Sequence, residues 1–422
     1  MNIRMSIILS TGIIMARYGY DQMPPTLWLI LLLVMTSMAI VLRKWLQSQC
    51  ILFYICLFLL GGLLTSYQEC RNRKPVTYFT MDELSEQDRF LTTAQERRAE
   101  IEQKLKGLGI ENEDFGVIAA MAMGDKTALD KDTKEVYSVA GASHVLAVSG
   151  LHISIIFQLL IMLLGGNRRH IFVILSALVA IWMYVLFIGM PASAVRSATM
   201  LSVYGFVTMT RRNKNSLRSL SIAFTIMLLC NPLYLFDLSF QMSFAAVGSI
   251  IVFLPLLSSL YHPTHRLSQW IWGMLCVSAA AQIGTLPLIT YYFGRISCYS
   301  LLTTFIAIPA ATGILYLCCM LMLMSPFLLL SPTVSLFSWL ITWVAKALVV
   351  ITHFANTAFH LTSLAPGASI DGIHLPLPIL FIIYAALGLV YAGWIKMKRI
   401  RNKMARSQED FSPENALFTN YR

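Results

Sequence analysis

Charged residues are scarce in this chain. Asp, Glu, Lys and Arg make up 13% of the 422 residues, whereas apolar residues make up 57% and the mean hydropathy is +0.67. This composition excludes an ordinary soluble globular protein. Several apolar runs reach the length of about 20 residues that a helix needs to cross the hydrocarbon core, and the alternating pattern of a membrane barrel is absent. The sequence therefore predicts an all-α polytopic membrane protein.

Motifs of metal, disulfide and nucleotide chemistry are also missing. The eight cysteines have no metal-ligand spacing, and most lie in apolar runs, where cysteine behaves as a small hydrophobic residue. No GxxxxGK[ST] loop is present to cradle the phosphates of ATP. We therefore expect no cofactor, no metal and no enzymatic activity of the chain itself.

The apolar runs predict about twelve transmembrane helices, with re-entrant or interfacial segments among the shorter ones. The first run is expected to be an anchor and not a signal peptide, because no small-residue cleavage site follows it and Arg17 interrupts its end. The expected spans are 5–20, 26–42, 50–67, 145–164, 171–190, 191–209, 217–230, 234–257, 270–293, 297–324, 334–359 and 375–395.

The distribution of charge predicts the topology. Residues 68–143 contain 15 acidic and 11 basic residues, which leaves 21 basic and 6 acidic residues elsewhere. Lys and Arg are retained on the cytoplasmic side of a membrane. Twelve spans with a cytoplasmic N-terminus place five basic clusters, the C-terminal tail among them, on that side, and the acidic segment outside.

One stretch, AGASHVLAVSGLHISIIF at residues 140–157, carries histidines, glycines and serines into an apolar run. Ionisable residues in a membrane segment are costly and are functional-site candidates by default. Ser149 and His152 are three residues apart and are therefore neighbours on a helix. Gly150 permits a kink or a close backbone approach, and His144 lies at the outer end of the predicted span. A role in helix packing is the alternative interpretation.

Other polar residues interrupt the later spans. The polar residues inside the spans are His152, Arg196, Asp237, Gln241, Gln282, Lys346 and His353. Each charged group at a bilayer centre costs roughly 2.5 to 3.5 kcal/mol. Such groups need a partner or a wet cavity. Two interpretations stay open, namely a polar pathway and an Arg196–Asp237 ion pair that holds helices together.

These motifs, taken together, resemble the signature of the ComEC family, the inner-membrane DNA-uptake channels of bacterial competence. The resemblance covers about residues 107–309. The matching positions are Gly124-Asp125-Lys126, Ala140-Gly141, HVLAVSGLH at 144–152, Arg196, Pro232, DLSFQMSF at 237–244, Gly284, Pro287 and Phe293.

The chain also departs from the family pattern. ComEC proteins commonly carry an oligonucleotide-binding-like domain, for which residues 68–114 are too short, and many end in a metallo-β-lactamase-like domain, whose HxHxDH motif is absent. Strand degradation therefore cannot be assigned to this chain. The family often has an asparagine where residues 302–304 are LTT, which removes one polar channel contact.

The resemblance implies passage of single-stranded DNA through the bacterial inner membrane. It implies a membrane anchor at 1–67, a polar extracytoplasmic segment at 68–114, a channel domain at 115–395 and a basic cytoplasmic tail at 396–422. Expected partners are single-stranded DNA, the lipid bilayer, a DNA receptor, a cytoplasmic translocase or single-strand-binding protein, and a second copy of the chain. The implied DNA-path residues are His144, Ser149, Gly150, His152, Arg196, Asp237, Gln241 and Ser243.

Three other functions remain as alternatives. The chain is a specialised or degenerate family member without DNA uptake, an intramembrane serine protease, or a small-molecule transporter. A protease would need Ser149 close to a histidine such as His353, but the GxSxG pattern fails at both glycine positions. A transporter would show tandem halves with matching broken helices, and the sequence has no convincing internal repeat.

Overall fold

The computed structural model describes residues 3–19, 23–42, 46–72, 98–103, 106–107, 110, 112–165, 171–209, 216–330 and 335–410. The chain divides into two compact units. Unit 1 comprises Met1–Phe244 and Ser297–Ser369, and unit 2 comprises Ala245–Ile296 and Ile370–Arg422. Helix α11 and the short strands β1 and β2 run from one unit into the other.

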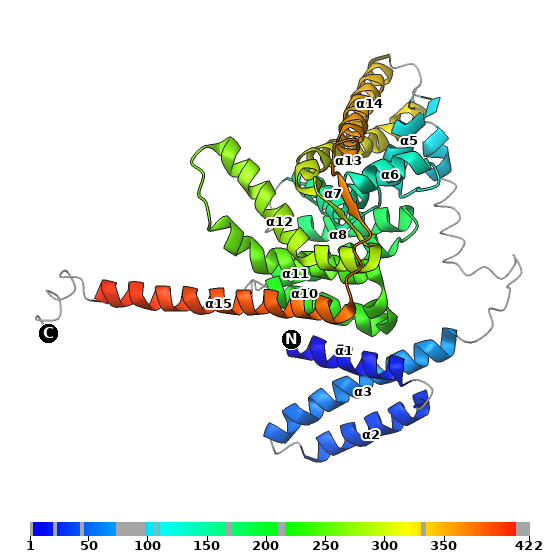
Figure 1. Cartoon of the computed structure of the whole chain (residues 1–422). Helices are drawn as coiled ribbons and strands as arrows, with labels where there is room; N and C mark the ends of the chain where they lie inside the picture. Colours follow the sequence, from blue (N-terminus) through cyan, green and yellow to red (C-terminus); the bar gives the residue numbers. More distant parts are fainter. Residues whose placement is uncertain are drawn as a thin grey trace, which may run out of the picture. The chain divides into compact units, whose positions relative to one another are not determined.

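Helices account for nearly all of the described structure, as the composition predicts (Figure 1). Their bounds are α1 Ile3–Tyr18, α2 Pro25–Val41, α3 Leu46–Asn72, α5 Asn112–Ile118, α6 Lys131–Val139, α7 Gly150–Leu163, α8 Ile171–Phe187, α9 Ala192–Met209, α10 Ser216–Cys230, α11 Leu238–Ser258, α12 Arg266–Phe293, α13 Ser300–Leu330, α14 Ser335–Ser363 and α15 Leu377–Asp410. Short elements between them are the π-helix η2 Ala119–Met123, the 3₁₀ helices η3 Ser143–Val145 and η4 Pro232–Phe236, and the paired strands β1 Arg295–Ser297 and β2 Ser369–Asp371.

Helices α1, α2 and α3 pack side by side (Figure 1). A Cβ built on Gly12 of α1 would lie 2.1 Å from the carbonyl oxygen of Phe58 in α3, and one on Gly61 would lie 2.6 Å from that of Leu9. Small residues allow two apolar helices to approach at backbone distance, and this is how helices associate where no water drives them together. The two glycines therefore set the α1–α3 interface.

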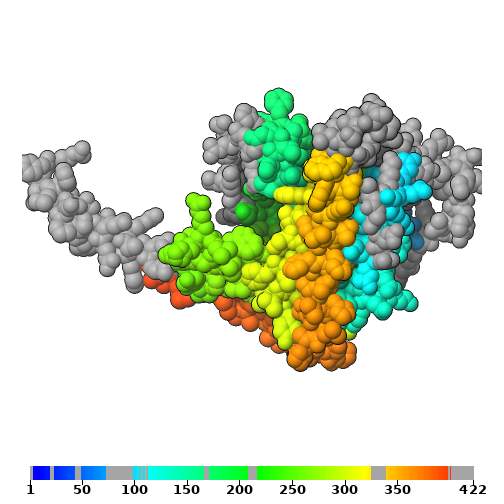
Figure 2. All heavy atoms as spheres, turned by 90° about the horizontal axis from the view of Figure 1, so that it is seen from above, coloured from blue at the N-terminus to red at the C-terminus, as the bar shows by residue number. Residues whose placement is uncertain are grey.

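The main core of unit 1 is built from η2, α7, α8, α9, α13 and α14. Helix α14 packs along α13 and also contacts α5 and α6, so in Figure 2 it forms a ridge between the yellow α13 and the cyan segments. Alanines at the contacts, such as Ala311 and Ala345, are fully buried and allow close packing. This core surrounds the stretch at 140–157.

Unit 2 is held by contacts within α11, α12 and α15. Ser249 of α11 donates to the carbonyl of Ala280 in α12 at 2.6 Å, and Tyr384 of α15 donates to the carbonyl of Gly284 at 2.7 Å. Gly284 also lies against α11, since a Cβ there would be 2.6 Å from the carbonyl oxygen of Ala245. The glycine thus permits the close approach of α11 and α12.

Six helices are long and apolar enough to cross a membrane, and four shorter apolar helices accompany them. Each predicted span coincides with a helix, of which α15 continues past the predicted end at residue 395 to Asp410, but the number of twelve crossings is not confirmed. The first reason is length: the 14 residues of α7 extend about 21 Å, whereas the hydrocarbon core is about 30 Å thick. The second is polarity, because α9 carries Arg196 and is not among the helices that are apolar enough to cross a membrane.

The polar segment before the core is described in part. Residues 98–103 and 106–107 are helical, and residues 104–105 lie outside the described residues. Gly124 ends η2 with a φ of +74°, a backbone conformation that favours glycine. Strands β1 and β2, joined by an ion pair between Arg295 and Asp371, were missed because three-residue strands leave no readable pattern.

Candidate functional site

The site begins where α7 starts, at Ser149. The side chain of Ser149 accepts a hydrogen bond from the backbone N–H of His152, and His152 Nδ1 accepts one from the backbone N–H of Ser149. The two side chains also lie 2.7 Å apart, between Ser149 Oγ and His152 Nδ1. This is a reciprocal capping box, in which the first turn satisfies its own free N–H groups. The predicted neighbourhood of Ser149 and His152 is confirmed.

The capping box corrects two details of the sequence-based picture. The helix begins at Gly150 and not near residue 145, so Ser149-Gly150 is a helix start and not a kink inside a span. The residues before it form the short η3 turn and irregular backbone, on which His144 is exposed. Irregular backbone at membrane depth is tolerated where protein or a water-filled cavity surrounds it.

Helix α9 lies beside this start and contacts it through two serines. Ser193 donates to the carbonyl of Val148 at 2.5 Å, and a Cβ on Gly150 would lie 2.9 Å from Ser197 Oγ. The close approach of α7 to α9 therefore depends on Gly150 having no side chain. Sequence reasoning missed both serines, although their spacing around Arg196 in SAVRS places all three on the first two turns of α9.

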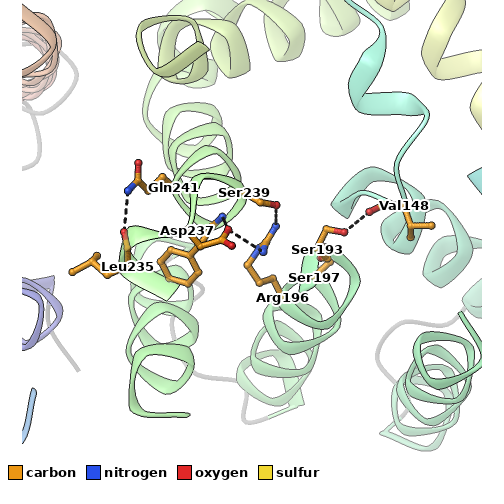
Figure 3. A network of polar contacts seen from close by, with 9 residues as sticks. Val148, Ser193, Arg196, Ser197, Leu235, Asp237, Ser239 and Gln241 are labelled. Carbon is orange, nitrogen blue, oxygen red and sulfur yellow. Dashed lines mark hydrogen bonds and ion pairs between the residues drawn. The ribbon is translucent and has the colours of Figure 1, made fainter. Parts of the chain in front are cut away.

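Arg196 points from α9 toward the first turn of α11 (Figure 3). Its Nη2 donates to Ser239 Oγ at 2.5 Å, and its Nη1 lies 4.0 Å from Asp237 Oδ1. Asp237 caps α11, because its Oδ1 accepts the N–H of Phe240 at 2.8 Å. The predicted ion pair is present at the outer limit of such a contact, and Ser239, which the sequence did not single out, is the nearer partner.

The guanidinium is buried but incompletely satisfied. Arg196 is 3% exposed, and its Nε and Nη1 have no hydrogen-bond partner among the described residues. His152 is fully buried, and its Nε2 likewise has no partner in that part of the chain. Buried donors without acceptors are rare in proteins, so each indicates a ligand, a water or a strained contact.

The remaining candidates take different directions. Gln241 donates its Nε2 to the carbonyl of Leu235 at 3.0 Å, and Figure 3 shows it turned away from Arg196. Ser243 lies one turn beyond Ser239 on α11 and is half-buried. The structure therefore brings Arg196 close to Asp237 and Ser149 close to His152, and α9 contacts both helix starts. Gln241 lies apart from these residues.

Helix α13 and the last residue of strand β1 fix the backbone that leads into η3. Thr303 is buried, and its hydroxyl donates to the carbonyl of Ala140 at 2.8 Å, while Ser297 donates to the carbonyl of Val139 at 2.9 Å. Gly141, the next residue along the chain after Ala140, has a φ of +78°. Thr303 belongs to the LTT sequence at residues 302–304, where an asparagine is common in the family, and its hydroxyl thus makes a structural contact.

A second polar network lies where α14 meets α5 and α6. Tyr137 donates to Asn356 Oδ1 at 2.6 Å, Asn356 Nδ2 donates to Asp114 Oδ1 at 2.7 Å, and His353 Nδ1 lies 3.6 Å from Asp114 Oδ2. Burial raises the pKa of Asp114 above its ordinary value, against the hydrogen bond from Asn356 and the effect of His353, which lower it. No feature of the sequence near Asp114 predicts this network, which joins residues more than 200 positions apart.

Ser149 and His353, the pair that a serine protease would need, have different partners in the structure. His353 contacts Asp114 and is largely exposed, whereas Ser149 contacts His152. His152 Nδ1 already accepts the Ser149 N–H, as a capping residue does. The arrangement is that of a helix cap, and no carboxylate orients His152 among the described contacts.

A family model described as competence protein matches residues 121–397, which is more than half of the chain. The chain belongs to the ComEC/Rec2 competence family. The match includes η3, α7, α9, and α11, and thus every residue of the capping box and of the Arg196 cluster. The predicted resemblance is confirmed.

Two curated relatives are similar to this ComEC/Rec2 chain. ComE operon protein 3 of Bacillus subtilis (strain 168) is 30% identical over 252 residues, covering 57% of this chain and 30% of the relative. Recombination protein 2 of Haemophilus influenzae (strain ATCC 51907 / DSM 11121 / KW20 / Rd) is 24% identical over 233 residues, covering 51% and 28%. The matched region thus spans less than a third of each relative. No solved structure gives a significant match.

The capping box of the ComEC/Rec2 chain gives a first prediction. Ser149→Ala is expected to lower the free energy of unfolding by about 1 kcal/mol, because the N–H of His152 loses its acceptor at the start of α7. Ser149→Asp should retain most of that stability, since aspartate caps as well as serine does. Thermal unfolding of the purified protein in detergent measures both variants, and equal loss in the two would contradict a capping role.

Proposed function

We propose that this chain forms part of the passage through which single-stranded DNA crosses the inner membrane during natural transformation. The observation that carries the proposal is the competence family match over residues 121–397. The apolar helices of the chain support a membrane location. The proposal extends to cytoplasmic termini, which five basic clusters favour, and to a DNA receptor and a cytoplasmic translocase or single-strand-binding protein as partners.

The chemistry of the helix starts supports a path for a polyanion. A strand with one negative charge per nucleotide needs polar groups and few deep attractive sites, because strong binding would trap it. Arg196 is the only arginine or lysine buried below one tenth exposure among the described residues. Serine hydroxyls at the same place add donors without adding charge, and the helix N-termini add a partial positive charge.

Gene deletion in the bacterium that encodes the chain tests the proposal. Cells receive radiolabelled duplex DNA that carries a selectable marker, and label is measured separately in the envelope and as protected single strands in the cytoplasm. We expect envelope binding to persist and both cytoplasmic label and transformants to fall by at least about 100-fold, as expected for loss of an essential step. Restoring the gene in trans should restore both.

Two outcomes decide against a DNA passage. Normal cytoplasmic label in the deletion strain would reject the proposal outright. Loss of transformants with unchanged cytoplasmic label would place the chain after entry. A degenerate family member would show neither defect, so the same experiment separates that alternative.

A further inference from the structure

Side chains of α9 join the starts of three helices, because Ser193 and Ser197 contact the start of α7 and Arg196 contacts the start of α11. Ser193, in the first turn of α9, bonds to Val148 just before the start of α7, and Ser197 touches Gly150. Arg196 bonds to Ser239 in the first turn of α11. The N–H groups of His152 and Phe240 are capped by Ser149 and Asp237, and each helix start still carries about half a positive charge. The helices are 14, 18 and 21 residues long, so each dipole is fully developed.

The charge of Arg196 is only partly neutralised by its surroundings. Asp237 is the nearest carboxylate, but its Oδ1 is 4.0 Å from Arg196 Nη1 and is committed to the Phe240 N–H at 2.8 Å. The Asp237 side chain is also 43% exposed, whereas that of Arg196 is 3% exposed. A buried guanidinium normally finds acceptors for its donors, yet Nε and Nη1 have none among the described residues.

The geometry points to a phosphodiester site at Arg196, at the starts of α7, α9 and α11, in which Asp237 is the internal competitor for the guanidinium. The inference rests on the proposed function for the source of the phosphodiester, a nucleic-acid strand. Arginine is suited to this ligand, because its planar N–H groups match the oxygens of a phosphate. One singly charged group would supply the acceptors that Nε and Nη1 lack. The nearby carboxylate keeps the contact weak enough for a strand to leave.

Binding of a fluorescent dT12 oligonucleotide to the full chain in dodecyl maltoside tests the site, because this detergent contains no phosphate. Arg196→Ala should weaken binding at least about 10-fold, the loss of one charge-assisted contact. It should also reduce the slope of log K against log salt by about 0.7, the value for one phosphate contact of a single strand. Lys131→Ala, which removes one charge from the exposed start of α6, is the matched control and should change the affinity less than 2-fold.

Asp237→Asn tests the site through an expected gain in affinity, which a misfolded protein would not show. Asparagine caps a helix as well as aspartate does, so α11 should persist. The change frees Arg196 from its competitor and should tighten binding about 3-fold or more, whereas Asp132→Asn on exposed α6 removes the same charge without that effect. Unchanged affinity in both Arg196→Ala and Asp237→Asn would overturn the inference.

A phospholipid headgroup carries the same phosphodiester, so short-chain phosphatidylglycerol serves as a second probe. Arg196-dependent binding of the lipid without Arg196-dependent binding of dT12 would reject a nucleic-acid strand as the ligand. A dT12 with a neutral methylphosphonate backbone should bind equally to the unmodified protein and to Arg196→Ala. The outcome is separable from the uptake experiment, because a deletion strain with normal cytoplasmic label would reject the transport role and leave the binding result standing.

Discussion

Replacing Gly12 with leucine is expected to separate α1 from α3. A Cβ at this position would lie 2.1 Å from the carbonyl oxygen of Phe58, and 2.9 Å from its carbonyl carbon, so the obstacle is backbone and cannot rotate away. Overpacking a close interface typically costs about 1 to 3 kcal/mol, and a backbone clash lies at the upper end or beyond. Gly61→Leu should have a similar effect, because its Cβ would meet the carbonyl oxygen of Leu9 at 2.6 Å.

The matched control is Gly388→Leu in α15, where a Cβ meets nothing within 4 Å. It should be neutral or stabilising, since glycine inside a helix costs up to about 1 kcal/mol relative to alanine. Thermal unfolding in detergent and the amount of protein recovered from membranes measure all three variants. Equal behaviour of Gly12→Leu and Gly388→Leu would show that the α1–α3 contact does not stabilise the protein.

The positions of helices were predictable because length and apolarity alone determine them. The run at 171–190 became α8 at Ile171–Phe187, and the proline at 191 separates it from α9, as proline at a helix start does. The start of one helix was predicted wrongly. The apolar run from residue 145 contains Ser149, which caps α7, so the helix begins at Gly150. A capping box made by histidine instead of glutamate or glutamine is outside the usual pattern.

The site was predictable to the extent that an unusual residue in an apolar run stands out. Arg196, Asp237, Ser149 and His152 were found for this reason. Ser193 and Ser239 were not, because serine in an apolar helix most often bonds to its own backbone. Whether it reaches a neighbouring helix depends on how two helices cross, and that information is not local in the sequence.

The largest effect of a single polar change is expected at Asn356. Tyr137 is 1% exposed, and Asn356→Leu would leave its hydroxyl without an acceptor and would remove a donor to Asp114. A buried polar group without a partner costs about 1 to 3 kcal/mol, and more when it is charged. The expected loss of unfolding free energy is therefore about 3 kcal/mol. Asn356→Asp is not a suitable control, because it adds a charge beside Asp114.

Tyr137→Phe provides the graded comparison for the same contact. It removes the hydroxyl and preserves the ring, which packs against Phe359 with centroids 4.7 Å apart. Only the oxygen of Asn356 loses a partner, so the loss should be about 1 kcal/mol. Destabilisation by Tyr137→Phe as large as that of Asn356→Leu would mean that the bond to Asp114 contributes nothing.

Asp114 links this network to pH. Burial raises the pKa of its carboxyl in the folded protein, so the folded state binds a proton more readily than the unfolded state does. Stability contributed by this group therefore falls as pH rises from the ordinary pKa of aspartate through the raised one, and the penalty is complete above it. Asp114→Asn keeps an acceptor for Asn356 and removes the titration. The difference in melting temperature between Asp114→Asn and the unmodified protein should thus increase with pH across this window and then stay constant, whereas parallel pH profiles would show that Asp114 titrates as it does in the unfolded chain.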